Sequence, residues 1–519
     1  MFSLLLLPLL AAPCLAASAS DWQKRTIYQV MTDRFATSDG SGPTCNTDDK
    51  KYCGGTWKGI TNHLDYIQNM GFDAIWISPI VANVQGTTAY GEAFHGYWPV
   101  DIFDINSHYG TADDLKSLSS ALHKRSMYLM LDVVVNHLVS NSNPPQFTND
   151  FKPFNAQSDF HPECFITDYN NQTNVEQCWL GDEKLVLADV DTEDSTIVTT
   201  LNGWIKDLVG NYSADGIRID TVKHVRKDFW PDFASSAGVF TIGEVLSNET
   251  SYTKDYTQVL DSVLDYPTWY PLVAGFQTTN GDLTKLANSV QLTQSAYKNG
   301  AFGSGSFLDN HDQPRFAGLV ANADSALIKN AMAFPFIHDG IPIVYQGQEQ
   351  GYTGGADPAN REALWLSGYV EDKDYVNHIK ALSAARKAAA STNDKFYSTK
   401  MTFPTNTTTS LAISKSPMLA LLTNVGSKAA TTSWSVSDTG YAGNTELVDV
   451  LSCATVTTDS SGKVTASSQN GQPMVFIPKS ALSKSAGVCS SVATGAASLG
   501  RGVSYSLVAG IALSWAFLF

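Results

Sequence analysis

The sequence predicts an α/β fold built from a (β/α)8 TIM barrel, a small inserted domain (domain B) and a C-terminal antiparallel β-sandwich (domain C). Three observations predict this fold. Eight short apolar runs alternate with segments of helical period, one interval between runs is long and irregular, and the last part of the chain alternates in polarity. The length of 519 residues suits two or three domains.

The barrel is predicted by the alternation of strand-like and helix-like segments. The apolar runs lie near Ile27, Ile75, Leu131, Ile217, Ile242, Val263, Phe307 and Val344. Between the runs, apolar residues recur with helical spacing over 113–124, 197–212, 283–297 and 324–333. Alternating strands and helices imply a parallel sheet, and eight repeats imply that the sheet closes. We assign residues 20–136 and 191–395 to the barrel.

The irregular interval lies between Asn136 and about Asp191. It has no helical period but many Pro, Asn and Asp residues and two cysteines, so we expect a helix-free domain B over 137–190. From residue 396 the chain is rich in Thr, Ser and Val, and its polarity alternates over 407–416 and 418–424. This pattern predicts the antiparallel domain C over 396–490.

Composition narrows the class of ligand. The net charge is −16, which argues against nucleic acid, because surfaces that bind nucleic acid are basic. Only 16% of residues are charged, whereas the chain has 24 Phe, 21 Tyr and 11 Trp. Aromatic rings on a polar, acidic protein suit a neutral, polyhydroxylated ligand.

Both ends of the chain resemble targeting signals. Residues 1–19 predict a secretory signal peptide, although the usual positive charge at its start is missing. An apolar, uncharged tail over 507–519 follows a polar spacer and small residues at Gly495. This order predicts a glycosylphosphatidylinositol (GPI) signal over 491–519 with attachment at Gly495. The alternative is a membrane-spanning helix, for which the tail is short. We therefore expect the protein on the outer face of the plasma membrane or in the cell wall.

Seven cysteines are present, and Cys14 lies in the predicted signal peptide. An even number in the rest of a secreted chain predicts disulfides, but the sequence does not fix their pairing. The six are Cys45, Cys53, Cys164, Cys178, Cys453 and Cys489.

The segment 216–220 carries the strongest chemical signal. It is a short apolar strand that ends in Arg218 and Asp220, whose side chains point to the same side because strand residues alternate. A neighbouring guanidinium lowers the pKa of a carboxyl group, so we expect an ionised Asp220, as a carboxylate nucleophile requires. For this segment alone, a structural ion pair is an equal alternative.

Three further apolar runs end in similar residues. The run 129–135 leads into Asn136 and His137, 239–243 leads into Glu244, and 305–310 leads into His311 and Asp312. Taken singly, each carboxylate could be a helix cap, a surface residue or a turn residue. Together, strand ends of this kind predict that Asp220, Glu244 and Asp312 gather on one face of the barrel.

These four segments, in this order, resemble the four sequence regions of the α-amylase family (glycoside hydrolase family 13). The chain is most similar to secreted fungal α-amylases of the Taka-amylase type, and the resemblance extends over about 21–490. It includes the distinctive strings 52–57, 109–115 and 357–362. The resemblance implies the same three parts: barrel, domain B and domain C.

The resemblance assigns roles to the three carboxylates. A retaining glycosidase needs two carboxyl groups about 5–5.5 Å apart. Asp220 is then the nucleophile, Glu244 is the proton donor, with a pKa raised by burial and neighbouring carboxylates, and Asp312 stabilises the transition state. The resemblance also implies these substrate contacts: His95, Tyr97, Trp98, His137, Arg218, Lys223, His224, His311, Asp357 and Arg361.

A calcium site and three disulfides are implied in the same way. The Ca²⁺ ligands would be Asn136, Glu176, Asp189 and the backbone carbonyl of His224. The implied disulfides are Cys45–Cys53, Cys164–Cys178 and Cys453–Cys489. A fourth bridge of the Taka type is absent, since Lys254 and Ser295 occupy its positions.

Departures from the family pattern concentrate near the acceptor side of the cleft and the metal region. Ala188 replaces a proline and Gln313 an asparagine, and Asn248 replaces a glycine that lines acceptor subsites in Taka-type enzymes. Asn248 also begins a glycosylation sequon. The four sequons begin at Asn171, Asn211, Asn248 and Asn406.

The function implied is that of an endo-acting, retaining α-amylase. It would hydrolyse internal α-1,4-glucosidic bonds in starch- or glycogen-like α-glucans, with cell-wall α-glucan as a further substrate, and we expect a calcium-dependent monomer. A 4-α-glucanotransferase of the same family is the alternative, but some such GPI-anchored relatives lack the counterparts of His137 and His311. A non-catalytic glucan-binding protein would not need Asp220, Glu244 and Asp312.

Overall fold

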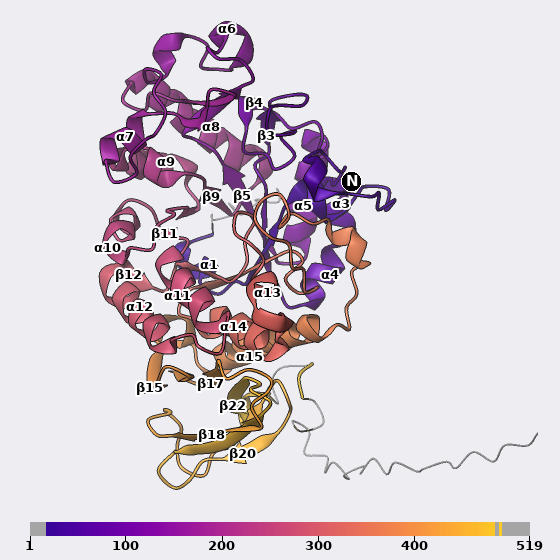
Figure 1. Cartoon of the computed structure of the whole chain (residues 1–519), viewed down its shortest axis with the longest axis vertical. Coiled ribbons are helices and arrows are strands. Elements are labelled where there is room, and N and C mark those ends of the chain that lie inside the picture. Colours follow the sequence, from indigo (N-terminus) through magenta and orange to yellow (C-terminus); the bar gives the residue numbers. More distant parts are fainter. Residues whose placement is uncertain (1–16, 483–486, 490–491, 493–519) are drawn as a thin grey trace, which may run out of the picture.

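The computed structural model describes residues 17–482, 487–489 and 492 (Figure 1). The predicted GPI signal beyond residue 492, with Gly495, and nearly all of the predicted signal peptide lie outside the described residues. Domain B lies at one end of the molecule, the barrel in the middle and domain C at the other end (Figure 1). Among the described residues, no helix has the length and apolar character to cross a membrane.

The predicted eight-stranded barrel is confirmed. The strands are β1 (Ile27–Val30), β2 (Ala74–Ile77), β5 (Tyr128–Val133), β9 (Gly216–Ile219), β10 (Phe240–Gly243), β11 (Ser262–Val263), β13 (Gly305–Phe307) and β14 (Ile341–Tyr345). All neighbours pair in parallel in the order β11-β10-β9-β5-β2-β1-β14-β13. A parallel bridge between Leu264 and Gly305 joins the two ends of this order and closes the barrel.

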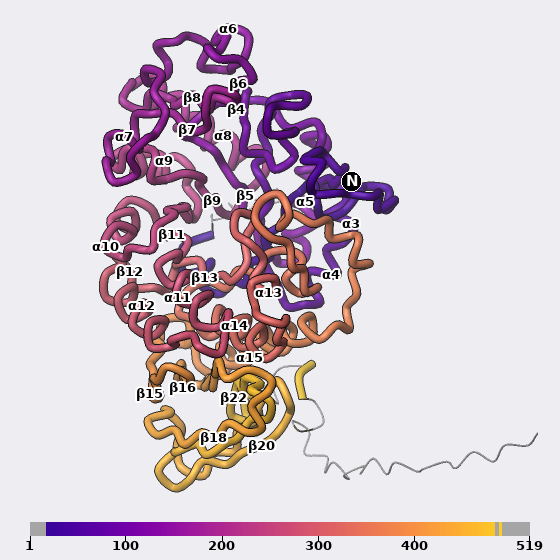
Figure 2. Tube along the Cα trace, in the orientation of Figure 1, coloured from indigo at the N-terminus to yellow at the C-terminus, as the bar shows by residue number. Residues whose placement is uncertain are grey.

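Helices cover the outside of the barrel (Figure 2). The helices of the barrel are α1 (Ala19–Trp22), α2 (Thr32–Phe35), α3 (Trp57–Asn62), α4 (Leu64–Asn69), α5 (Ala112–Lys124), α8 (Ser195–Tyr212), α9 (Trp230–Ala237), α10 (Thr250–Thr253), α11 (Tyr266–Phe276), α12 (Leu283–Ala296), α13 (Phe316–Leu319), α14 (Ser325–Ile337) and α15 (Asp374–Thr392). Side-chain caps fix several starts: Thr111 and Asp114 form a capping box on α5, and Asp194 caps α8. The four predicted helices agree with α5, α8, α12 and α14, but α14 continues past Pro335.

Domain B differs from the prediction of a helix-free segment. Its three-stranded antiparallel sheet is formed by β6 (His137–Ser140), β8 (Leu185–Asp189) and β7 (Leu180–Asp182). It also contains the short helices α6 (Phe147–Asp150) and α7 (Gln172–Gln177). The prediction was wrong because helices of four and six residues are too short to show a 3.6-residue period. A second missed feature is the antiparallel pair β3 (Val81–Asn83) and β4 (Pro99–Ile105), which follows β2.

Domain C is the predicted antiparallel sandwich, with one large and one small sheet. The large sheet has the order β15 (Thr402–Asn406), β16 (Ser410–Lys415), β17 (Met418–Thr423), β22 (Met474–Pro478), β19 (Glu446–Asp449) and β20 (Thr455–Thr457). The small sheet pairs β18 (Thr431–Val436) with β21 (Val464–Gln469). Both faces of β17 are buried: Leu422 belongs to the main core shared with the barrel, and Leu421 faces the core between the two sheets.

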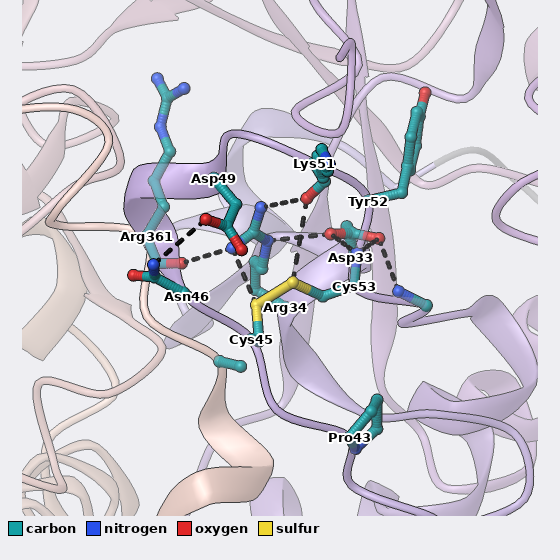
Figure 3. The surroundings of a disulfide bond; sticks show 12 residues. Asp33, Arg34, Pro43, Cys45, Asn46, Asp49, Lys51, Tyr52, Cys53 and Arg361 are labelled. Atoms are coloured by element: carbon teal, nitrogen blue, oxygen red, sulfur yellow. Dashed lines mark hydrogen bonds and ion pairs between the residues drawn. A yellow bond between two sulfur atoms is a disulfide. The ribbon is translucent and has the colours of Figure 1, made fainter. Parts of the chain in front are cut away.

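Three disulfides join the cysteine pairs that the family resemblance implies: Cys45–Cys53, Cys164–Cys178 and Cys453–Cys489. The first lies beside a buried ion pair between Asp33 and Arg34 (Figure 3). Arg34 donates to the carbonyl oxygen of Lys51 at 2.7 Å and to that of Arg361 at 3.4 Å, while the Asp33 carboxylate accepts from the Cys53 backbone N–H. Arg34 therefore joins the loop closed by this disulfide to the backbone of Arg361, one of the predicted substrate contacts.

Candidate active site

The carboxyl ends of the barrel strands surround a hollow of about 310 Å³. Asp220 directly follows β9, Glu244 directly follows β10, and Asp312 lies in the loop after β13. All three line the hollow together with most of the other predicted site residues. Its lining comprises His95, Tyr97, Trp98, His137, Leu180, Leu187, Asp220, Thr221, Glu244, Leu246, Tyr266, His311, Asp312, Asp357 and Arg361.

A second hollow of about 450 Å³ adjoins the first. The two share Leu180, Thr221, Glu244 and Leu246. The second hollow contains two more of the predicted residues, Lys223 and His224, and it adds Tyr169, which is 59% exposed. Neither Asp220 nor Asp312 lines it. Glu244 therefore stands between two spaces, and Asp220 faces only one of them.

Arg218 is the centre of the carboxylate cluster. Its Nη1 lies 2.8 Å from Asp220 Oδ1 and 2.9 Å from Asp132 Oδ1, and its Nη2 lies 3.1 Å from Glu244 Oε2. The guanidinium is 1% exposed, so it contacts carboxylates instead of solvent. Arg218 thus acts beneath the cleft, where it holds Asp220 and Glu244 side by side, and it does not line either hollow.

One cation among several buried carboxylates leaves the cluster with excess negative charge. Burial raises the pKa of Asp220 well above its usual range; the Arg218 charge opposes this rise, and the charges of Glu244, Asp132 and Asp312 add to it. Burial also raises the pKa of Asp132 to about 6. The expectation that Arg218 lowers the pKa of Asp220 was right for that pair, but burial and the neighbouring carboxylates outweigh it. The cluster therefore retains a proton more readily than isolated carboxylates do.

The backbone at Thr221 adds a further contact to Glu244. Thr221 adopts a left-handed conformation with φ of 49°, which is strained for a β-branched residue. In this conformation its N–H donates to Glu244 Oε2 at 3.2 Å. The residue after Asp220 therefore orients the carboxylate of Glu244.

Asp312 is held from the opposite side of the hollow. Its Oδ1 lies 3.5 Å from Arg361 Nη2, and its Oδ2 lies 3.5 Å from His311 Nε2. Gln29 Nε2 donates to His311 Nδ1 at 2.7 Å, which leaves the proton of a neutral His311 on Nε2. Burial holds the pKa of His311 well below its usual range. His311 is therefore a neutral donor that faces the hollow. The side chain of Asp312 is 35% exposed, so a ligand can reach it.

Aromatic and imidazole rings form the wall near Asp220. The rings of Tyr97 and His311 stack with centroids 5.1 Å apart, and Tyr97 donates to Asp132 Oδ2 at 2.6 Å. His137 Nε2 lies 3.1 Å from the Tyr97 carbonyl oxygen, and burial lowers the pKa of His137 to about 4. The predicted rings thus come together around one space, on the side of Asp220 and Asp312.

Sequence analysis missed seven residues of the site. Asp132 offered a signal, because a carboxylate inside an otherwise apolar buried strand needs a charged partner. The others gave no signal along the chain, since a Tyr, Thr or Leu in a loop is unremarkable until the fold places it. The missed residues are Asp132, Tyr169, Leu180, Leu187, Thr221, Leu246 and Tyr266, of which Leu180 and Leu187 lie on strands of domain B.

Two of the predicted calcium ligands, Asn136 and Asp189, offer buried side-chain oxygens that suit a hard cation. Asn136 and Asp189 are each 1% exposed, and the Val190 N–H donates to the Asn136 carbonyl at 2.9 Å, which holds their segments together. Within the described residues, Asn136 Oδ1 and Asp189 Oδ1 have no hydrogen-bond partner. His161 Nδ1 lies 2.6 Å from the other Asp189 oxygen, so it orients this carboxylate in the way that outer-shell partners orient metal ligands.

The other two predicted ligands lie beside each other. Gln172 Nε2 donates both to Glu176 Oε1 at 2.7 Å and to the Lys223 carbonyl at 3.0 Å, and the Val175 carbonyl lies 3.2 Å from His224 Nδ1. These contacts join α7 of domain B to the turn after β9. A cation held by oxygens of Asn136, Asp189, Glu176 and His224 would link domain B to the barrel next to Asp220.

Comparisons with known proteins agree with this geometry. Residues 29–410 match the family model described as the α-amylase catalytic domain, and residues 395–496 match α-amylase domain C. The α-amylase of Saccharomycopsis fibuligera is 43% identical over 463 residues, which cover 89% of this chain and 92% of that protein. α-Amylase 2 of Schwanniomyces occidentalis is 44% identical over 91% of this chain and 94% of its own. The structure of an α-amylase from Malbranchea cinnamomea is 42% identical, with a TM-score of 0.89, and covers 91% of this chain and 100% of that one.

The (β/α)8 barrel carries carboxylates at its strand ends, and a hollow lined by aromatic and imidazole rings lies beside them. Together with these matches, this arrangement identifies the protein as a glycoside hydrolase. Within that class, the chain belongs to the α-amylase family, and its close relatives are fungal.

Proposed function

We propose that this chain is a retaining α-amylase that hydrolyses internal α-1,4-glucosidic bonds in starch- or glycogen-like α-glucans. The observation that carries the proposal is the contact of Asp220 and Glu244 with different nitrogens of one guanidinium. Two carboxyl groups side by side at the edge of a hollow suit double displacement, which needs a shorter separation than inversion does.

In the first step, an Asp220 oxygen attacks the anomeric carbon of the glucose unit in the first hollow. The bond to the leaving oxygen breaks, and Glu244 transfers its proton to that oxygen. In the second step, Glu244 takes a proton from water, the water oxygen attacks the anomeric carbon, and Asp220 leaves. Neutral His311 donates from Nε2 to a sugar hydroxyl, and Asp312 stabilises positive charge at the transition state. His137 gives its single N–H to the Tyr97 carbonyl and so fixes the wall of the first hollow.

The two hollows define the direction of the glucan. The unit attacked by Asp220 occupies the first hollow, with Asp312 and the rings. The leaving unit must lie beside Glu244 but away from Asp220. The second hollow meets both conditions, and Tyr169, Lys223 and Leu246 also line it. We name the first the donor hollow and the second the acceptor hollow. Because sugar units occupy both, a bond within a chain can be cleaved, and this supports endo action.

Calcium supports this site by charge and by structure. When bound by Asn136, Glu176, Asp189 and the His224 carbonyl, Ca²⁺ supplies positive charge and fixes domain B against the barrel. His224 follows Asp220 by four residues and also lines the acceptor hollow, so the order of this turn affects both catalysis and binding.

A 4-α-glucanotransferase is the second candidate, because the walls of the acceptor hollow suit a sugar as well as water. Tyr169 offers an exposed ring, and Leu180 and Leu246 offer apolar surface. A sugar hydroxyl that enters here in the second step would form a new glucosidic bond. A proton NMR time course on maltoheptaose separates the possibilities. Hydrolysis with retention first releases products with an α-anomeric end, transfer produces chains longer than the substrate, and β-anomeric products would contradict the retaining mechanism.

We further propose that the protein is secreted and held at the cell surface by a GPI anchor near Gly495, where starch-like glucans and wall α-glucan are accessible. The support is the order of signals at both ends of the sequence. Phosphatidylinositol-specific phospholipase should release the enzyme from membranes, and deletion of 507–519 should send activity to the medium. An intact apolar tail in the mature protein, found by mass spectrometry, would contradict the anchor.

A further inference from the structure

The loop between β10 and α10 forms one rim of the acceptor hollow. Leu246 lines both hollows, and its side chain is 38% exposed. Its carbonyl oxygen accepts from Lys223 Nζ at 3.0 Å, and that ammonium lies 5.2 Å from the ring centroid of Tyr169. These contacts fix the loop at the entrance through which the leaving end of a glucan must pass.

Asn248 lies two residues beyond Leu246 on this rim. Two residues of extended chain span at most about 7 Å, so the Asn248 backbone cannot be far from the hollow. Asn248 is exposed, and within the described part of the chain its side chain makes no hydrogen bond to protein. Glu249 and Thr250 complete an N-x-T sequon. An acceptor amide is therefore exposed at the edge of the substrate path.

We propose that Asn248 carries an N-linked glycan that restricts the acceptor hollow to short, unbranched glucan ends. The proposal rests on the proposed secretion and on the proposed direction of the glucan. An N-linked glycan is bulky and strongly hydrated. At this position it occupies the space into which a long or branched acceptor end would continue, whereas a short oligosaccharide ends within the hollow. The glycan thereby lowers kcat/KM on polymers more than on oligosaccharides.

The other sequons lie in different places. Asn211 is near the end of α8 and Asn406 ends β15 in domain C, and neither lies near a residue of the acceptor hollow in the sequence. Asn171 lies two residues from Tyr169, but its side chain already accepts from the Asn174 N–H and caps α7. A substitution there would disturb the helix as well as any glycan. Asn248 therefore permits the cleaner test, and Asn406 provides a distant control.

The test uses the full chain secreted from a eukaryotic host. Thr250→Ala removes the sequon and keeps Asn248, Thr250→Ser keeps the sequon, and Asn406→Gln removes a distant one. Glycopeptide mass spectrometry measures occupancy at Asn248, and kcat/KM is measured on maltopentaose and on soluble starch. We expect a glycan at Asn248 in the wild type and in Thr250→Ser. In Thr250→Ala the ratio of starch to maltopentaose kcat/KM should rise several-fold, with no such rise in Asn406→Gln or Thr250→Ser.

Two results would overturn the proposal: an unmodified Asn248, or an unchanged ratio in Thr250→Ala. Asn248→Gln repeats the removal if Thr250→Ala fails to fold, since Asn248 has no protein partner to lose. Failure of the proposed function is distinguishable, because it would show as no cleavage of maltopentaose by any variant, while glycan occupancy would still be measured.

Discussion

Arg218 is the single residue that organises the chemistry of the cleft. It is buried, it contacts Asp132, Asp220 and Glu244, and one positive charge cannot neutralise three carboxylates. The proposed double displacement needs one carboxyl group that attacks as an anion while its neighbour delivers a proton. The carboxyl groups of the proposed nucleophile and the proposed proton donor therefore share contacts with one guanidinium.

Replacement of the nucleophile tests the role of Asp220. Asp220→Asn keeps the size of the side chain but removes the attacking anion, so kcat on maltopentaose should fall by about 10³-fold or more. Circular dichroism and the melting temperature should show a folded protein. Asp228→Asn is the matched control, because Asp228 pairs with Arg226 on the surface and is 79% exposed. Near-normal turnover by a folded Asp220→Asn variant would rule out this nucleophile.

Sequence analysis locates the residues whose signal is local. Asp220, Glu244, His311 and Asp312 follow apolar runs, so strand ends alone indicated them. Tyr169 gave no such signal, because it lies on a domain B loop and reaches the hollow only through the packing of α7 against the turn after β9. For residues of this kind, the sequence does not indicate a place in the cleft, because only the fold brings them there.

At the scale of elements, α11 links a barrel strand to the site. Asp265 follows β11 and caps the helix by accepting from the Thr268 N–H, and Tyr266 beside it lines the donor hollow. Asp265 is buried and also accepts from the Tyr297 hydroxyl at 3.0 Å. Burial raises the pKa of Asp265 to about 6.

This raised pKa predicts a pH-dependent effect of Asp265→Asn. The folded state binds the Asp265 proton more tightly than the unfolded state does, so the stability that Asp265 contributes is full below about pH 3.8 and is lost as pH rises through about 6. Asparagine stays neutral. Relative to the wild type, the variant should therefore gain stability between pH 4 and 7, by up to about 3 kcal/mol for a pKa change from 3.8 to about 6.

Urea unfolding of both proteins at several pH values measures this difference. A constant offset between them is expected from the changed side chain and does not affect the test. A difference that does not change with pH, or one that moves in favour of the wild type as pH rises, would contradict a raised Asp265 pKa.

Buried apolar strands and long helices could be predicted from the sequence, whereas short helices could not. The barrel strands are buried on both faces and read as apolar runs, and α5, α8 and α12 span several turns. In contrast, α7 has six residues and is held by the Asn171 cap and by Cys164–Cys178 at its end. Its stability comes from a cap and a crosslink, which leave no periodic pattern.

At the scale of the whole molecule, three parts are joined by buried contacts. Domain C packs one face of its large sheet on the barrel, and Lys415 of β16 forms a 2.7 Å ion pair with Asp339 in the barrel. Both side chains are 0% exposed. Burial lowers the pKa of Lys415 to about 8, so at neutral pH the ammonium remains charged.

Loss of one partner would leave a buried charge unpaired. Lys415→Ala should therefore destabilise the protein by about 3–5 kcal/mol. Lys479→Ala is the matched control, because Lys479 and Glu446 form an exposed pair that contributes at most about 1 kcal/mol. Thermal and urea unfolding measure both effects. Equal, small losses in the two variants would show that this pair does not hold domain C to the barrel.

Calcium should stabilise the junction of domain B with the barrel. A ligand bound only by the folded state raises stability by mass action, by about 2.7 kcal/mol at a concentration of 100 times Kd. Chelator should therefore lower the melting midpoint by several degrees, and added Ca²⁺ should restore it. Asn136→Ala removes one buried ligand, so this variant should melt early and respond little to chelator. An unchanged wild-type midpoint, with no metal found by elemental analysis, would contradict the site.

The most direct test of the central claim is the capture of the covalent intermediate. A 5-fluoro-α-glucosyl fluoride should react with Asp220 and form a glycosyl ester that breaks down slowly. Peptide mapping by mass spectrometry should then place the added sugar on the peptide that contains Asp220, and Asp220→Asn should not be labelled. A label on another carboxylate would contradict double displacement through Asp220. The absence of any label, together with the release of β-anomeric products, would contradict it as well.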